Sequence, residues 1–88
     1  MPSPRYRAIR RRDGTILDVD PGLASLIGTT REAMIGRPGS EFVSATVEQR
    51  SRTRATLRLT GRADGVGTLI HQRTGELIRV RFRATRNT

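Results

Sequence analysis

The sequence contains no cysteine, no lysine and no tryptophan, and only three of its residues are aromatic. The absence of cysteine excludes disulfides, thiolate metal sites and thiol nucleophiles together. No apolar run approaches the roughly 18 residues of a membrane span, and the first residues lack the apolar segment of a secretory signal. These absences predict a soluble protein of the cytoplasm.

The length and composition limit the hydrophobic core. The chain has 88 residues, of which 34% are hydrophobic, and a domain of this size buries only about 60–65% of its unfolded surface. We expect a frayed start over residues 1–5 and a single domain over residues 6–88. Contacts with a partner are expected to add to its modest stability.

Positive charge dominates the composition. All 17 basic residues are arginine, against eight acidic residues, which gives a net charge of +9 and a pI of about 11.8. A basic set made of arginine alone is consistent with a GC-rich bacterial genome. Such a charge attracts nucleic acids and anionic surfaces nonspecifically, so the placement of the arginines matters more than their number.

Two hairpins are predicted, one at each end of the chain. Residues 5–12 and 15–19 flank Asp13 and Gly14, a pair typical of a type I′ turn in which both residues have positive φ. Residues 66–72 and 77–85 flank a turn around Thr74 and Gly75. In the last strand apolar residues alternate with arginines, which predicts one buried and one solvated face.

Helix signals fill the region between the hairpins. Asp20 followed by Pro21 is typical of a helix start, and Gly28 of a helix end. Residues 29–32 form a capping box for a second short helix, which stops at Gly36. Ser40 is expected to cap a one-turn segment. Another capping box opens a longer helix over residues 46–59, although residues 55–60 also alternate like a strand.

This element order predicts an α+β fold in which short helices cover one face of an antiparallel sheet. Residues 62–65 are interpreted as a flexible connection between the long helix and the second hairpin.

Three segments resemble the PAS domain family. Residues 13–28 (DGTILDVDPGLASLIG) are similar to its D-G-x-I-x-x-x-N-P-A-x-x-x-L-x-G run, residues 30–38 (TREAMIGRP) to its S-x-E-E-L-I-G-R-P segment, and residues 73–80 (RTGELIRV) to its late hairpin. Asp20 stands in place of the usual asparagine, and Ser44 with Ala45 in place of the usual proline-aspartate step. The resemblance implies a sensory or regulatory module of bacterial signal transduction or transcription, acting beside a signalling partner or a fused output domain.

The family orders its sheet 2-1-5-4-3, and no counterpart of the fifth strand is found in the sequence. About half a dozen buried backbone groups without partners, at about 1–3 kcal/mol each, would cost on the order of 10 kcal/mol, so the gap between the first and fourth strands is not expected to stay open. We expect these two strands to pair directly, a partner chain to supply a strand, or the N-terminal segment to rearrange. A homodimer that manages these edges is the preferred outcome.

No cofactor and no catalytic activity are expected. The family's flavin photochemistry needs a cysteine, and its haem-binding members use a histidine on the long helix; both are absent. The single histidine, His71, faces inward, opposite Ile78, if the turn has two residues. It faces outward if a three-residue loop pairs Ile70 with Val80, the register that the family favours. The carboxylates fall in turns, caps and loops, and no motif for metal binding, nucleophilic catalysis or phosphate binding is present.

Two sets of residues are candidates for binding. The first should line the space between sheet and helices, as a filled core or as a pocket for a small apolar metabolite: Phe42, Val47, Leu57, Ile70, Val80 and Phe82. The second projects from the outer face of the last strand, as a solvated face or as an interface: Arg79, Arg81 and Arg83. A stripe on the long helix adds Arg50, Arg54 and Arg58. A small nucleic-acid binder is the alternative, although few aromatic residues are present to stack on bases.

Overall fold

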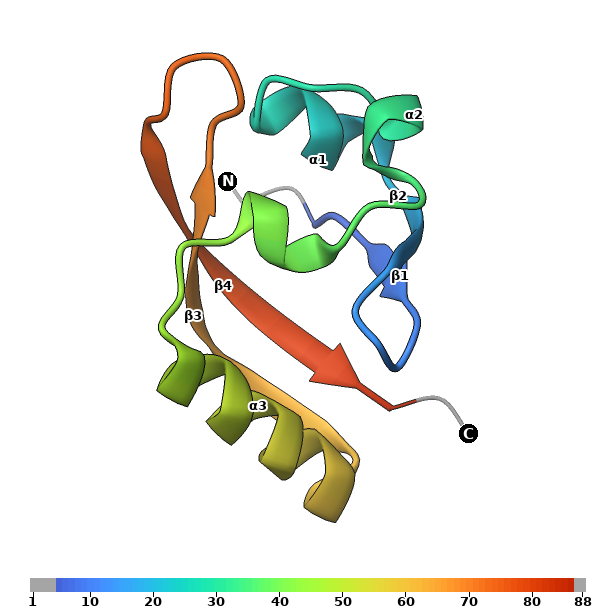
Figure 1. The fold of residues 1–88 in the computed structure, drawn as a ribbon, viewed down its shortest axis with the longest axis vertical. Coiled ribbons are helices and arrows are strands. Elements are labelled where there is room, and N and C mark those ends of the chain that lie inside the picture. Colours follow the sequence, from blue (N-terminus) through green and yellow to red (C-terminus); the bar gives the residue numbers. More distant parts are fainter. Residues whose placement is uncertain (1–4, 87–88) are drawn as a thin grey trace.

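A computed structural model describes residues 5–86 (Figure 1). The expectation of a frayed start falls largely on residues 1–4, outside the described part. The elements, in chain order, are β1 (Ala8–Arg10), β2 (Ile16–Val19), α1 (Pro21–Leu26), α2 (Arg31–Met34), η1 (Gly39–Phe42), α3 (Val47–Thr60), β3 (Arg62–Ile70) and β4 (Leu77–Thr85).

The α+β class is confirmed, but the strands form two separate antiparallel sheets of two strands each. One sheet pairs β1 with β2, and the other pairs β3 with β4. In Figure 1, β4 lies between β3 and the β1–β2 hairpin. No ladder joins β1 to β4, so the direct pairing of the first and fourth strands does not occur.

The turn of the first hairpin differs from the predicted type I′ turn. Gly14 has a φ of 95°, but no residue other than glycine has positive φ among those described. Arg11 accepts from the Gly14 N–H (2.9 Å) and donates to the Thr15 carbonyl (2.8 Å), while the Asp13 carboxylate accepts from the Thr15 N–H (2.9 Å). The aspartate side chain therefore fixes a three-residue loop in which only glycine needs a left-handed conformation.

The short helices begin close to the predicted positions, with different caps. α1 begins at Pro21 as expected, but the Asp20 carboxylate accepts from the Arg7 N–H (2.7 Å) instead of capping the helix. Thr30 caps α2 by accepting from the Ala33 N–H (3.2 Å), so the box predicted over residues 29–32 is wrong. Ser40 lies inside η1 and is not its cap.

The long helix has the predicted capping box. Thr46 Oγ1 accepts from the Gln49 N–H (3.1 Å), and Gln49 Oε1 accepts from the Thr46 N–H (2.9 Å). Gly61, with φ of 80°, ends the helix. None of the residues of α3 is buried, so its start and end signals, and not a packed face, define this helix.

The second hairpin is longer than predicted and has another register. Residues 62–65, interpreted as a flexible connection, form the first part of β3. The ladder pairs Ile70 with Leu77, and the His71 N–H donates to the Glu76 carbonyl (2.8 Å). Both predicted registers are therefore wrong. The expected alternation in β4 is confirmed, although its inner side chains are only partly buried.

The core lies in the N-terminal half of the chain. Its cluster of buried residues comes from β2, α1 and its C-terminal end, α2 and η1: Ile16, Val19, Ala24, Ile27, Met34 and Phe42. Leu69 of β3 and Ile78 of β4 pack against this cluster. Among residues 45–86, Ala63 is the one buried hydrophobic residue. The second hairpin is thus anchored at one end and thinly covered along the rest of its length.

Candidate interaction site

The backbone of β4 has an edge that no described strand covers. The Arg86 N–H donates to the Gly61 carbonyl (2.9 Å), which continues the β3–β4 ladder beyond its last pair. Hydrogen-bonded pairs alternate along an antiparallel ladder, so the even-numbered residues of β4 bond to β3. The odd-numbered residues point their N–H and C=O groups away from β3. Within residues 5–86 these groups have no hydrogen-bond partner; they belong to Leu77, Arg79, Arg81, Arg83 and Thr85.

β1 has a shorter open edge. The Arg7 carbonyl accepts from the Asp20 N–H (2.9 Å), so the same alternation directs the backbone groups of Ala8 away from β2. The other side of β2 is covered, since the Ile16 N–H donates to the Arg37 carbonyl (2.9 Å).

β1 and β4 therefore have open edges, and β3 has a partly open one. On the side of β3 away from β4 the Ser44 N–H donates to the Thr68 carbonyl (2.9 Å), while the backbone groups of Asp64 and Val66 have no partner within residues 5–86.

Exposure to solvent explains why the edges of β1 and β4 stay unpaired. All three residues of β1 and every odd-numbered residue of β4 are exposed, Leu77 by 60%. Water can satisfy their backbone groups, so the cost expected for buried, unpaired groups does not apply.

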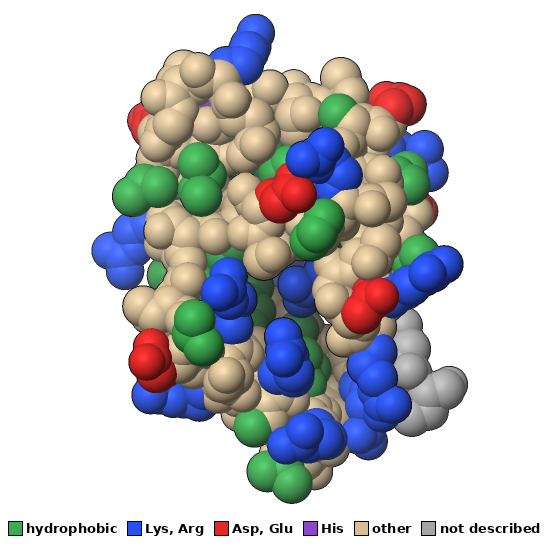
Figure 2. Space-filling model, in the orientation of Figure 1, with side chains coloured by type: hydrophobic (Ala, Val, Ile, Leu, Met, Phe, Trp, Pro, Cys, Tyr) green, Lys and Arg blue, Asp and Glu red, His purple; other side chains and the backbone are tan. Residues whose placement is uncertain are grey.

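The two faces of β4 differ in chemistry. On the outer face Arg79, Arg81 and Arg83 stand opposite Thr68, Val66 and Asp64 of β3. On the inner face the Phe82 ring lies across Gly65 and Gly67 of β3, where an added Cβ would meet the ring at 3.1 Å and 3.6 Å. Val80, Phe82 and Ala84 are partly exposed, and Figure 2 shows the surface hollowed between η1 and α3.

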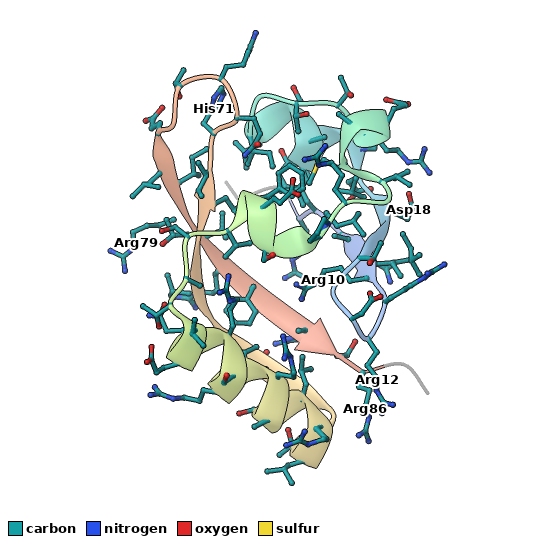
Figure 3. All side chains as sticks on the ribbon, in the orientation of Figure 1. Arg10, Arg12, Asp18, His71, Arg79 and Arg86 are labelled. Carbon is teal, nitrogen blue, oxygen red and sulfur yellow. The ribbon has the colours of Figure 1, made fainter. Side chains whose placement is uncertain are left out.

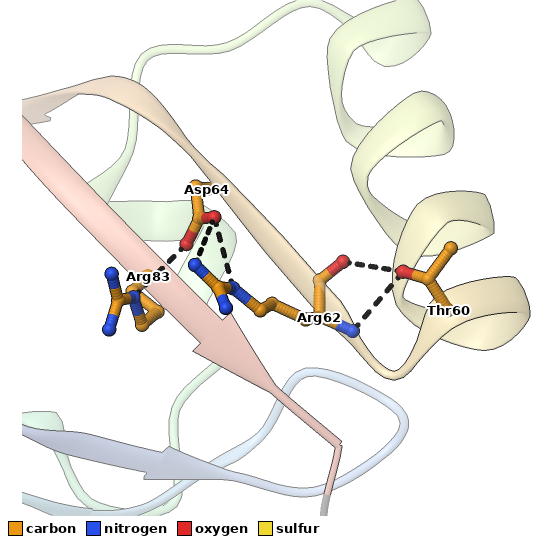
Figure 4. A network of polar contacts seen from close by, with 4 residues as sticks. All are labelled: Thr60, Arg62, Asp64 and Arg83. Atoms are coloured by element: carbon orange, nitrogen blue, oxygen red, sulfur yellow. Dashed lines mark hydrogen bonds and ion pairs between the residues drawn. The ribbon is translucent and has the colours of Figure 1, made fainter.

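An ion-pair network neutralises one end of the outer face (Figure 4). Asp64 accepts from Arg62 (3.0 Å) and from Arg83 (3.3 Å). The hydrogen bond from Arg62 lowers the pKa of the Asp64 carboxyl, and the charges of both arginines lower it further. Arg83 is thus already partnered, whereas Arg79 and Arg81 form no ion pair among the described residues.

Most of the positive charge has no acidic neighbour. Within residues 5–86 ion pairs engage four of the 17 arginines: Arg31, Arg37, Arg62 and Arg83. Figure 2 shows arginine side chains gathered around α3 with few acidic side chains between them. Figure 3 places Arg12 and Arg86 at the same corner of the molecule in that view, by the first turn and the end of β4.

The stripe predicted on α3 is exposed throughout. Arg50, Arg54 and Arg58 all face solvent, and each pair in the stripe repels by about a few tenths of a kcal/mol. The Arg58 carbonyl accepts from the Arg86 guanidinium (2.8 Å). This contact places a cation at the C-terminal end of the helix, where the helix dipole favours one.

The six predicted pocket residues occupy different environments. Phe42 is 5% exposed within the core cluster, whereas Val47 is 65% exposed at the start of α3. The other four, Leu57, Ile70, Val80 and Phe82, are partly buried. Two open hollows in the surface are lined by other residues: one by Arg7, Ile9, Asp18, Val19 and Asp20, the other by Asp64, Gly65, Val66 and Arg81.

His71 is held by its surroundings in a partly buried position (Figure 3). A Cβ added to Gly28 would meet its ring at 2.3 Å. Its Nδ1 accepts from the N–H groups of Arg73 (3.3 Å) and Thr74 (3.2 Å). No cluster of three or more histidine and acidic residues that could hold a metal occurs in residues 5–86. These contacts give His71 a structural role in closing the second hairpin against α1.

Sequence reasoning identified the arginine row of β4 but missed the open backbone edge beside it. The signal was present in part, since alternation of arginine with apolar residues marks a strand with two unlike faces. That pattern does not contain the register of β4 against β3, which decides which backbone groups of β4 point away from β3. In the part of the chain that the structure describes, no helix is long and apolar enough to cross a membrane.

No protein-family model matches the chain, and no curated protein matches it either.

Proposed function

We propose that this chain is a PAS-like regulatory interaction module that binds another protein chain at the open edge of β4. The observation that carries the proposal is the set of outward N–H and C=O groups on a nine-residue strand with an arginine row on one face. An exposed strand edge is a template for pairing with another chain. Main-chain hydrogen bonds give affinity in such complexes, and alternate side chains give specificity.

The likeness to the PAS family is supported by the order of the elements. Two strands precede three short helical segments and one long helix, and a hairpin follows. The family places a further strand between its first and fourth strands. The unjoined edges of β1 and β4 are consistent with that arrangement. We propose a role in bacterial signal transduction or transcriptional control, without catalysis.

A peptide-display experiment tests this function. A random-sequence library is selected against the wild-type chain, and the selected peptides are measured against Arg81→Pro. The Arg81 N–H points away from β3, so proline removes an edge donor but no ladder bond, and edge strands tolerate proline. Selected peptides that lose affinity for Arg81→Pro and largely keep it for Arg81→Ala support edge binding. Equal affinity for all three chains, or no binders, refutes it.

The homodimer expected from the sequence stays a prediction, and light scattering decides it. A dimeric mass at high micromolar concentration is the expected result. A strictly monomeric mass would exclude self-association, while binding of other chains at β4 would still be open to the display experiment.

A further inference from the structure

The chemistry of the two faces of β4 restricts which chain can pair with its edge. Along an added strand, successive side chains point to opposite faces of the extended sheet. Those on the outer face stand beside Arg79 and Arg81, which have no ion-pair partner within residues 5–86. Those on the inner face stand beside Val80 and Phe82, which are partly exposed.

We infer, resting on the function proposed above, that the partner of this edge is an extended segment in which acidic and apolar residues alternate. Its carboxylates meet Arg79 and Arg81 on the outer face, and its apolar side chains cover Val80 and Phe82 on the inner face. Its backbone pairs with the outward groups of the odd-numbered residues of β4.

Charge complementarity favours a segment of about seven residues centred on Arg81. Such a segment spans about 23 Å in the extended conformation and covers most of the nine residues of β4. At the far end Asp64 already neutralises Arg83 (3.3 Å), so an acidic group gains less there than beside Arg79 or Arg81.

A second copy of this chain fits the β4 edge poorly, so the homodimer expected from the sequence would not be held by pairing of two β4 strands. If two β4 strands paired edge to edge, the Arg79, Arg81 and Arg83 rows of the two copies would lie side by side. Like charges on neighbouring strands are destabilising, and the whole chain carries a net charge of +9. The segment that alternates acidic and apolar residues in this sequence, Leu17–Asp20, lies in β2 and the turn after it. β2 is occupied on both sides, by β1 and by residues 36–37.

Nucleic acid is the competing anionic partner, and the geometry favours it less. Single strands bind through cationic grooves combined with aromatic side chains on which bases stack. Phe42 is buried, the Phe82 ring lies against Gly65 and Gly67, and Tyr6 lies against Gly22. No aromatic ring in residues 5–86 stands free beside Arg79 and Arg81.

The test uses a capped peptide of seven residues, alternating glutamate and valine, titrated into the full chain by calorimetry at physiological salt. One control peptide replaces each glutamate with lysine, and another keeps the composition but separates the glutamates from the valines. We expect binding of the alternating acidic peptide alone. Arg81→Ala should weaken it roughly two- to fivefold, as for an exposed ion pair, and Arg81→Pro by a further roughly tenfold through the lost edge donor.

Arg54→Ala is the matched control, since it removes the same charge from an exposed position on α3. We expect its affinity to stay within twofold of wild type. Amide exchange by NMR gives an independent readout. The N–H groups of Arg79, Arg81 and Arg83 should become protected on binding, whereas those of Val80 and Phe82, already bonded to β3, should change little.

Five outcomes overturn the inference. If the control peptide with glutamates and valines separated binds as well as the alternating peptide, the partner is attracted by net charge alone. The same holds if Arg54→Ala weakens binding as much as Arg81→Ala does. Binding of a single-stranded oligonucleotide, without binding of the peptide, means a nucleic-acid partner. Protection of the odd-numbered β4 amides in a peptide-free dimer means that a second copy occupies the edge. Edge-dependent display peptides without acidic residues would overturn this inference alone, and the proposed function would stand.

Discussion

The stability of this domain should depend on the buried cluster of the N-terminal half far more than on the exposed leucine at the end of α3. Ile27 is 1% exposed and is the largest side chain that is fully buried among those described. Leu59 is 80% exposed. Comparing Ile27→Val with Leu59→Ala tests whether the buried cluster carries the stability. Ile27→Val removes fewer atoms than Leu59→Ala, yet it should lower the free energy of unfolding more.

The expected magnitudes follow from burial. Ile27→Val deletes one buried methylene and should cost about 0.5–1.5 kcal/mol of unfolding free energy. A chain of 88 residues has a total stability of about 4–13 kcal/mol. A loss of 1 kcal/mol therefore lowers the Tm by about 4–8 °C. Leu59→Ala deletes three carbons that are mostly in water already, and alanine is the better helix former. Its effect should stay within about 0.5 kcal/mol.

Thermal and urea unfolding followed by circular dichroism measure both variants under the same conditions. Light scattering on each sample ensures that the same oligomeric state is compared. If Leu59→Ala lowers the urea midpoint as much as Ile27→Val, the end of α3 is buried in solution. The assignment of the stabilising core to β2, α1, α2 and η1 would then be refuted.

Three further predictions follow from single contacts. Thr46→Ala removes one half of the α3 capping box and should cost about 1 kcal/mol, seen as faster amide exchange in the first turn of α3. Gly28→Ala forces a Cβ onto a residue with φ of 74° and should cost at least about 1–2 kcal/mol, measured by urea unfolding; an unchanged midpoint would show that the turn relaxes freely. A hydrogen bond from Arg31 lowers the pKa of Asp18, so this contact stabilises the fold above the ordinary pKa of the carboxyl and is lost as the pH falls through the lowered value. Arg31→Gln should raise the Asp18 pKa toward 3.8 in a carboxyl NMR titration, and no change would rule the contact out in solution.

Local signals in the sequence predicted the helix boundaries well because the chemistry that sets them is local. Pro21 starts α1 and the box of Thr46 and Gln49 starts α3, since each needs only its neighbours in the chain. Gly28 and Gly36 have the positive φ expected of helix ends. Asp20 shows the limit of this reasoning: its carboxylate accepts from Arg7, 13 residues away, and a local pattern does not contain that partner.

The register of the second hairpin was beyond local reasoning for the same reason. Thr74 and Gly75 fit several turns equally well. The observed loop is fixed by bonds from the Arg73 and Thr74 N–H groups to His71, whose ring lies on Gly28 of another part of the chain. A shift of one residue changes the face of every side chain in a strand. The direction of His71 therefore depended on a tertiary contact.

The same dependence on long-range contacts separates the two halves of the molecule and bears on the edge-binding function proposed for β4. The first hairpin and the short helices share one buried cluster, while β4 touches it through Ile78. Beyond that point β4 is supported by β3, and its inner side chains are only partly covered. A strand added at this edge would bond to the free backbone groups and cover Val80 and Phe82 together. Binding and completion of the sheet would then be one event, so that the stability of the C-terminal half would rise with partner concentration. A small regulatory domain could use that linkage to report whether its partner is present.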